Sequence, residues 1–449
     1  MGGKLAFIVL AALLSFATCT RLCMVSGVGS VIRVPADYST IQEAINAALP
    51  GSTVVVSPGV YRENLVVDKT LNLTGEDKMT TIIDGDQRWT VVEIMADRVV
   101  LRGFTVQNSS QSQGAGGIFL NNSKQCEIKE NIIIHNAPAG LTIWNNSSDN
   151  LIDGNIVAFN SVIFPGWIEG YNIMLHDSNN NTVTGNVLSN SVVCGLYLGN
   201  SNDTKIMLNT IENNSDGLII YNSNNGTAHH NCFINNWYQL ELIEHSRGNV
   251  WDDGHEGNYW DDYVGLDDGS NGRIAGDSIG DTSLPHAGID ELGNFLGVDN
   301  YPLVRPPVPV SVFVENAAYT VAVEGNSTVS TFRFVQAEKK LTFNVTGPTA
   351  TAGYCNITIP KSLLRDSPWK IVLNGTDITA EAFIAENETH SSIYFTYNHS
   401  ISNVQIIGTW VVPELSPQTM LTTILIFAAS MILLKARKRE ENNLDSSVQ

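Results

Sequence analysis

A short phrase headed by asparagine recurs through the middle of the chain and limits what the chain can fold into. Each copy continues with short, mostly apolar runs, and successive copies start 22 to 31 residues apart. Self-similarity at a nearly constant period indicates one supersecondary unit stacked on copies of itself. The copies begin at Asn131, Asn155, Asn186, Asn209, Asn231 and Asn258, and glycine-headed phrases between them begin at Gly117, Gly140, Gly170, Gly195 and Gly217.

The contents of each period decide which kind of solenoid this is. Apolar runs of three or four residues, rich in Ile, Val, Leu and Tyr, alternate with polar clusters such as 145–148 and 178–181. These are strands and turns rather than helices, and a leucine-rich repeat would need a longer leucine-spaced consensus. The pattern predicts a right-handed parallel β-helix with three strands per coil. The asparagines are expected at coil corners, where they tolerate a left-handed backbone and pair with the same amide one coil away.

The charge balance excludes some partners. The chain has 449 residues, of which 43% are hydrophobic, with 25 Lys and Arg against 45 Asp and Glu for a formal net charge of −20. A body this acidic is not expected to bind nucleic acid or anionic lipid surfaces.

Both ends of the chain carry export signals. A basic start, an apolar run at 5–17 and a small-residue exit predict a signal peptide at 1–26, too short to span a bilayer. Residues 419–434 are uncharged, and four basic residues follow within 435–439. This stop-transfer pattern predicts a transmembrane helix at 413–435 and a cytoplasmic tail at 436–449, with the body outside.

A short helix is expected to close the first coil. Ser39 or Thr40 can cap a helix whose apolar residues, Ile41, Ala44, Ile45 and Ala48, fall on one face. Such a cap covers the end of the solenoid, where the strand edges would otherwise be exposed.

Two stretches resemble a known family. Val34–Ile45 with Val55–Glu63 resembles the opening of the extracellular right-handed β-helix superfamily that contains pectinesterases and NosD-like proteins. Gly257–Tyr263, Ile279–Thr282 and Asp299–Leu303 are similar to the closing segment of NosD-like copper-binding β-helix proteins. The resemblance spans about 32–306 and implies periplasmic copper handling.

The residues themselves do not support a copper site. Copper requires His, Met or Cys grouped in space. His135, His176, His229 and His245 lie at unrelated offsets from the asparagine phrases. Copper binding is therefore kept only as an alternative.

The β-helix, with its cap and an Asp-rich closing segment, is predicted to occupy 31–306. Residues 307–412 lack the repeat and have a different pattern. Apolar and polar residues alternate at 330–334 and 341–345, and a turn is expected at Asn374-Gly375. This pattern predicts a small antiparallel β-sandwich. It resembles C-terminal modules of archaeal surface proteins.

Cysteines and glycosylation sequons fit an exported protein. Cys126, Cys194, Cys232 and Cys355 are scattered without metal-ligand spacing, which predicts buried apolar thiols. Fifteen Asn-x-Ser/Thr sequons occur, six of them in 307–412, and glycosylation at several is expected.

Catalysis is not indicated by the acidic residues. Glycoside cleavage needs carboxylates that converge on one face. The acids of the coils share no common offset, and the best local group is Glu241, Glu244 and Arg247. A polysaccharide lyase or hydrolase therefore remains an alternative, with these three as its candidates.

One insertion in the repeat suggests a ligand-binding loop. The interval from Asn155 to Asn186 exceeds its neighbours by the stretch 164–169. Insertions in a solenoid become loops on one flank, often the binding flank. The alternative is that the loop folds back over apolar surface. Carbohydrate contacts are predicted for Trp144, Trp167, Glu169 and Tyr171.

A calcium site is predicted in the acidic segment. Residues 267–272 and 277–281 offer oxygen donors separated by glycines that let the backbone wrap a cation. The ligands to test are Asp267, Asn271, Asp277 and Asp281, and the alternative is a solvated acidic loop.

Together these features predict an exported, membrane-anchored, all-β protein that binds carbohydrate or cell-envelope glycans. The enzyme and the copper protein remain the competing classes.

Overall fold

The computed structural model describes residues 29–164, 167–289, 295–306, 310–314, 317–365 and 368–412. These residues form two compact units. The coil unit contains the residues up to His229, Asn236–Trp251 and Pro285–Val298, and the closing unit contains His230–Asn235, Asp252–Leu284 and the residues from Asp299 onward. The predicted leader (1–26) and membrane span (413–435) lie outside the described residues. Within the described ranges, no helix is long and apolar enough to cross a membrane.

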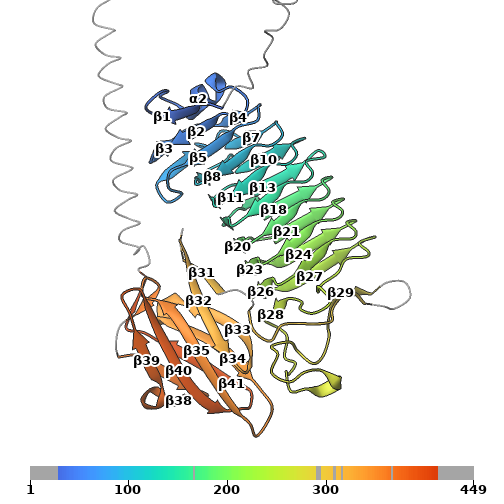
Figure 1. The fold of residues 1–449 in the computed structure, drawn as a ribbon, viewed down its shortest axis with the longest axis vertical. Coiled ribbons are helices and arrows are strands. Elements are labelled where there is room, and N and C mark those ends of the chain that lie inside the picture. The colour runs from blue at the N-terminus through green and yellow to red at the C-terminus, as the bar shows by residue number, and fades with distance from the viewer. Residues whose placement is uncertain are drawn as a thin grey trace, which may run out of the picture. The chain divides into compact units, whose positions relative to one another are not determined.

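The coil unit is a parallel β-helix in which each coil contributes one strand to each of three sheets (Figure 1). The predicted solenoid class and the three strands per coil are confirmed. Sheet A consists of β1 (Val31–Val34), β2 (Thr53–Val56), β5 (Asn72–Gly75), β8 (Val100–Arg102), β11 (Glu127–Lys129), β14 (Leu151–Asp153), β19 (Thr182–Thr184), β22 (Lys205–Met207) and β25 (Thr227–His229).

The other two sheets follow the same order along the unit. Within the coil unit, sheet B consists of β3 (Gly59–Tyr61), β6 (Thr81–Asp84), β9 (Thr105–Gln107), β12 (Ile132–Ile134), β15 (Ile156–Ala158), β20 (Val187–Ser189) and β23 (Thr210–Glu212). Sheet C consists of β4 (Leu65–Val67), β7 (Val92–Ile94), β10 (Ile118–Asn121), β13 (Ala139–Trp144), β18 (Tyr171–His176), β21 (Cys194–Gly199), β24 (Asp216–Tyr221) and β27 (Tyr238–Ile243).

The bore is filled by residues that stack in register from coil to coil. Ile128 of β11 pairs with Leu101 on one side and Ile152 on the other, and all three are fully buried. Because side chains alternate across a strand, fixing one inward residue per strand also fixes which residues face outward.

The phrase-heading asparagines form a buried ladder. The Nδ2 of Asn155 donates to Asn186 Oδ1 at 3.0 Å, and Asn155 Oδ1 accepts from Asn131 Nδ2 at 3.1 Å. The predicted pairing of like amides is confirmed. The left-handed backbone expected for these asparagines is wrong, because the positive φ belongs to the preceding residue, as at Glu130 and Gly154. The chain changes direction at this preceding residue, and the asparagine that follows it points into the coil.

A second ladder, missed from the sequence, lies five residues further on. Asn136 donates to Asn160 Oδ1 at 3.2 Å, and Asn214 donates to Asn236 Oδ1 at 3.1 Å. One coil has Ser191 at the equivalent place. There Asn172 of β18 fills the gap, with its amide bonded to Asn160 and Asn214, both at 3.2 Å.

The glycine-headed phrases are explained by this second ladder. A Cβ on Gly140 would lie 2.6 Å from the Asn160 amide nitrogen. Glycine is therefore required wherever a neighbouring asparagine occupies the ladder. The predicted copy at Gly170 is in the wrong register: Ile173 pairs with Leu141, so Asn172 is the equivalent of Gly140.

The predicted cap is confirmed as α2 (Ile41–Ala47). The Thr40 side chain accepts a hydrogen bond from Glu43 N, and Ile41, Ala44 and Ile45 are buried. The Glu63 carboxylate also accepts from the backbone N–H groups of Ile41 and Gln42, at 2.9 Å each. A carboxylate at this end of a helix satisfies free N–H groups and stabilises the helix.

The closing unit combines short elements with antiparallel sheets. Its first part holds β26 (Cys232–Ile234), β28 (Tyr259–Trp260) and η1 (Ser270–Gly272). One five-stranded sheet contains β31 (Val310–Val314), β32 (Ala317–Gly325), β35 (Ala352–Pro360), β40 (His390–Asn398) and β39 (Phe383–Glu386). The other contains β33 (Thr328–Val335), β34 (Lys340–Thr346), β41 (Ser402–Ile407), β37 (Lys370–Leu373) and β38 (Thr376–Asp377).

Smaller elements complete the described chain. A separate two-stranded sheet is formed by β29 (Leu284–Ile289) and β30 (Phe295–Asp299), and another by β36 (Leu364–Arg365) and β42 (Trp410–Val411). Single 3-10 turns occur at η2 (Gln336–Glu338) and η3 (Thr379–Glu381).

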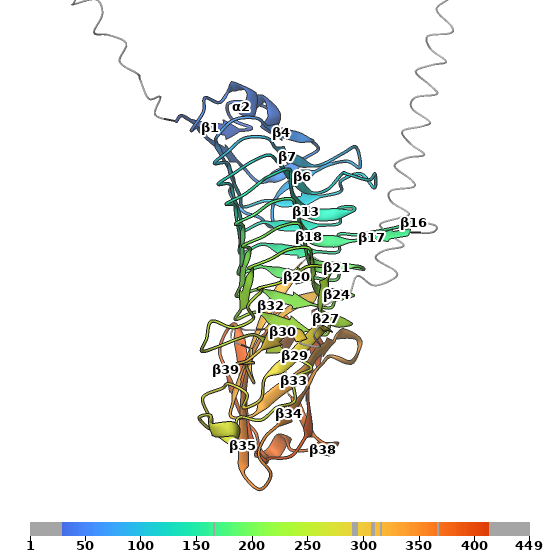
Figure 2. The same cartoon turned by 90° about the vertical axis from the view of Figure 1, so that its right-hand side faces the viewer.

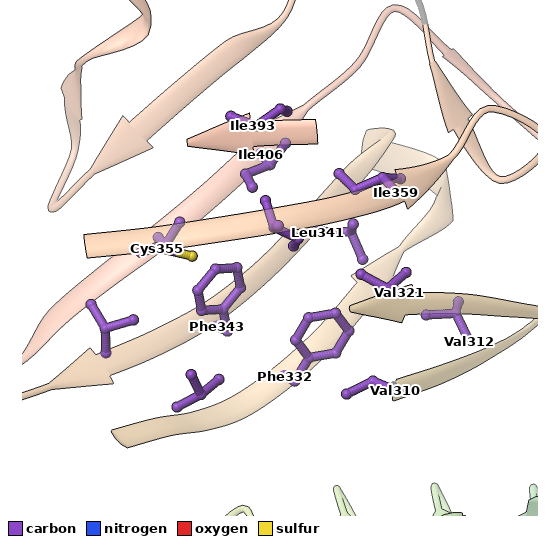
Figure 3. Close-up of a cluster of buried hydrophobic side chains, with 14 of the residues drawn as sticks. Val310, Val312, Val321, Phe332, Leu341, Phe343, Cys355, Ile359, Ile393 and Ile406 are labelled. Atoms are coloured by element: carbon purple, nitrogen blue, oxygen red, sulfur yellow. The ribbon is translucent and has the colours of Figure 1, made fainter. Parts of the chain in front are cut away.

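The two five-stranded sheets share one apolar core (Figure 3). Phe332, Leu341 and Phe343 of one sheet meet Val321 and Cys355 of the other. The predicted turn at Asn374-Gly375 is confirmed, since both residues have positive φ between β37 and β38. The antiparallel character expected for 307–412 is therefore borne out in the described residues.

The four cysteines beyond the leader are buried and unbridged. This confirms the prediction of apolar thiols. Burial raises the pKa of the Cys126 thiol to about 11, so the thiol stays protonated and unreactive.

Candidate functional site

The insertion after Asn155 is a β-hairpin that projects from the coils (Figure 2). It consists of β16 (Val162–Phe164) and β17 (Trp167–Glu169), paired antiparallel with Ile163 opposite Ile168. Ile168 is 54% exposed, so this side chain does not fold back over apolar surface. The Trp167 side chain lies outside the described residues, and its contact with a ligand stays a prediction.

A cavity of about 330 Å³ opens beside the base of this hairpin. Three of the predicted ligand-binding residues, Trp144, Glu169 and Tyr171, line it together. Phe119 and Met174, which the sequence interpretation did not single out, complete its apolar wall. We call this cavity the groove.

The register of sheet C explains why these side chains meet. Phe119 of β10 pairs with Thr142 of β13, and Thr142 pairs with Met174 of β18. Neighbouring strands lie about 4.8 Å apart, so outward side chains in one row are in contact. The rings of Phe119 and Trp144 pack edge to face with centroids 6.5 Å apart. A correct alignment of the coils would have revealed this row.

Glu169 is the only acidic side chain among the described residues that line the groove. Burial raises the pKa of its carboxyl above the usual value. Among the described residues, no donor is recorded on its carboxylate oxygens. The ring of Trp144 also contacts His176, at 5.1 Å between ring centroids, and His176 Nδ1 lies 2.9 Å from Asp177 Oδ2.

The candidate catalytic residues have separate partners. Burial and the nearby charge of Asp216 raise the pKa of Glu241. Glu244 forms a hydrogen bond with the Tyr221 hydroxyl, whose pKa is raised by it. The backbone N–H of Arg247 donates to Asn224 Oδ1 at 2.8 Å. In the described coils no ion pair joins Arg247 to either glutamate.

The predicted calcium ligands form a hydrogen-bonded loop. Asp281 Oδ2 accepts from three consecutive backbone N–H groups, 268–270, at 2.6 to 3.1 Å. Asp267 Oδ2 accepts from Ser278 N at 2.8 Å, and Asn271 Nδ2 donates to the Asp281 carbonyl at 3.0 Å. Asp277 accepts from Ile279 N at 3.0 Å. The aspartates thus have a role in holding the backbone that needs no cation.

One oxygen of this loop keeps the calcium prediction testable. Asp281 Oδ1 is buried and has no hydrogen-bond partner among the described residues. If calcium binds there, adding a chelator should lower the thermal midpoint of the purified body and restoring calcium should raise it. Calorimetry with and without the chelator measures this, and an unchanged midpoint would leave the hydrogen bonds as the only role of the aspartates.

Two of the histidines considered for copper contact aromatic rings. His135 stacks on Phe159 at 5.6 Å between centroids, and His176 lies against Trp144. His229 ends β25, and His245 follows β27. The expectation that the chain does not bind copper stays a prediction.

Comparisons with known proteins were consistent with the repeat. Residues 45–265 match the family described as periplasmic copper-binding protein (NosD). A cell surface glycoprotein of Methanothermus fervidus is 25% identical over 211 residues, covering 40% of this chain and 34% of that protein. The match thus spans about a third of the relative's length.

Several solved structures are similar to about half of this chain at low sequence identity. An alginate lyase from Paenibacillus has 13% identity and a TM-score of 0.32, covering 51% of this chain and 97% of that one. Pectate lyase Pel9A has 13% identity and a TM-score of 0.39, covering 51% and 74%. On the family match and the parallel coils described above, the repeat region of this chain is similar to the NosD-like parallel β-helix proteins.

Proposed function

We propose that this chain is an exported surface protein that binds carbohydrate in the groove on sheet C. The observation that carries the proposal is the combination of aromatic rings and one carboxylate without a described partner in a cavity of about 330 Å³. Cavities of this size, mostly apolar with a few polar groups, are typical of small-ligand sites.

The chemistry of the wall suits a sugar. The apolar C–H face of a sugar ring packs on an aromatic plane, and Trp144, Tyr171 and Phe119 supply such planes. Glu169 and the Thr142 hydroxyl can hydrogen-bond the ring hydroxyls. A site built on strands is held rigidly, which lowers the ordering cost of binding.

The surface location and the ligand's source are further parts of the proposal. The similarity to a cell surface glycoprotein supports export. Anchoring through 413–435 and binding of cell-envelope or extracellular polysaccharide follow from the sequence pattern alone. Protease treatment of intact cells should degrade the body and spare the tail.

The proposal is tested with Trp144→Ala on a glycan panel. Loss of one stacking plane, worth about 1.5 kcal/mol, should weaken binding of the best glycan roughly ten-fold. Trp237→Ala is the matched control, because Trp237 is 82% exposed and lies outside the groove. Affinity is measured by calorimetry on variants whose melting midpoints are checked first.

Two results would contradict carbohydrate binding here. One is unchanged glycan affinity in folded Trp144→Ala and Tyr171→Ala proteins. The other is that no glycan of a panel spanning neutral, amino and uronate polymers binds the unaltered protein.

A further inference from the structure

We infer that the groove is selective for glycans that carry protonated amino groups, and that Glu169 determines this selectivity. The inference rests on the proposed carbohydrate function and goes beyond it, because stacking on aromatic rings does not by itself distinguish charged from neutral sugars.

The strands of the three sheets of the coil unit differ in their lysine and arginine content, although acidic residues occur on all three. The eight strands of sheet C contain Glu93, Asp216 and Glu241 but no lysine or arginine. The basic residues on the strands of the three sheets all lie in sheet A: Arg33, Arg102, Lys129 and Lys205. The face that holds the groove is therefore negative, with no cationic side chain on its strands to receive an anionic sugar.

The charged side chain inside the groove is also negative. Among the described residues that line the groove, Glu169 is the only acid, and none is a lysine, arginine or histidine. A uronate placed here would bring a second carboxylate close to Glu169 without a compensating cation. Because Glu169 already loses solvation by burial, a second negative charge would disfavour its ionised form further.

An ammonium group fits the same surroundings. A cation is attracted both to an ionised carboxylate and to the face of a Trp or Tyr ring. Glu169 at the base of β17 is two residues from Tyr171, and both line the groove with Trp144. Since no described donor occupies the Glu169 carboxylate, it is available to an amino group of the ligand.

The test compares two oligomers with one backbone. Glucosamine hexamer carries amines, and N-acetylglucosamine hexamer carries neutral amides at the same positions. At a pH where both the amines and Glu169 are charged, we expect the glucosamine hexamer to bind about five-fold tighter, the scale of one partly exposed ion pair with a ring contact. The difference should shrink as salt is added.

The variant Glu169→Gln keeps the shape of the side chain and removes its charge. It should abolish the difference in affinity between the two hexamers. The matched control is Glu127→Gln, an acid on sheet A, which should preserve the difference. An oligogalacturonate should bind most weakly to the unaltered protein.

Each outcome separates the inference from the proposed function. Equal binding of the two hexamers, or tighter binding of oligogalacturonate, overturns the inference and leaves carbohydrate binding intact. A difference that persists in Glu169→Gln overturns the role of Glu169. If neither hexamer binds, the inference falls, and the wider glycan panel decides the proposed function separately.

Discussion

Replacing Asn155 with alanine is expected to lower the free energy of unfolding by roughly 3 kcal/mol or more, because several buried polar groups lose their partners together. Asn155 is fully buried. Its Oδ1 accepts from Asn131 N at 3.0 Å, and its Nδ2 donates to the Ile128 carbonyl at 2.8 Å and to Asn186 Oδ1 at 3.0 Å. Water cannot replace these bonds inside the bore.

Denaturant unfolding followed by circular dichroism measures the effect. The control is Asn121→Ala, on the outer side of β10, where among the described residues the amide bonds to the exposed side chain of Asn145 and the half-buried side chain of Glu93. A surface change of this kind should stay within about 1 kcal/mol. Equal losses for the two variants would show that the ladder adds nothing beyond an ordinary surface hydrogen bond.

Replacing Glu212 with glutamine is expected to stabilise the protein at alkaline pH and to change little in acid. Glu212 is buried at the end of β23, and its Oε1 has no hydrogen-bond partner in the described part of the chain. Burial raises the pKa of this carboxyl from 4.5 to about 8. The folded chain therefore keeps a proton that the unfolded chain releases.

The direction of the pH dependence follows from the difference between the pKa of Glu212 in the folded chain and in the unfolded chain. Below pH 4.5 both states are protonated, and the pKa shift has no effect on stability. Between pH 4.5 and 8 the unfolded state binds fewer protons, so the free energy of unfolding falls as the pH rises. Glutamine cannot ionise, so the gain from Glu212→Gln should grow through this window and reach on the order of 4 kcal/mol near its upper end.

Unfolding curves at several pH values check this expectation. The control is Glu130→Gln, at an exposed corner between sheets A and B, where a surface change should alter the free energy of unfolding by no more than about 1 kcal/mol. A constant difference between Glu212→Gln and the unaltered protein across the window would contradict a titrating buried carboxyl.

Local and periodic features of the fold could be read without coordinates. The solenoid class follows from short apolar runs at a period near 22, because only a stacked unit repeats its core in this way. The cap helix follows from Thr40 and the spacing of Ile41, Ala44 and Ile45, which are contacts within one turn or two. Pairing of the phrase-heading asparagines follows from their recurrence at one place in each coil.

The groove could not be predicted in full from the repeat pattern. Trp144, Glu169 and Tyr171 could be chosen because an insertion marks a flank, but Phe119 and Met174 join them only through the coil register. The register predicted at Gly170 is wrong, because Asn172 takes the place of a glycine where Ser191 interrupts the second ladder. A slip in register changes which side chains are neighbours and which face the core.

The sequence by itself therefore determined the kind of solenoid, its cap and the ladder of amides, since these arise from spacing along one coil. Tertiary structure decided which outward side chains share a groove, and it showed that Asp267 and Asp281 accept backbone hydrogen bonds. The physical reason is that such contacts join residues a whole coil or a whole loop apart. Their geometry is set by the length and register of everything between them, which no local pattern specifies.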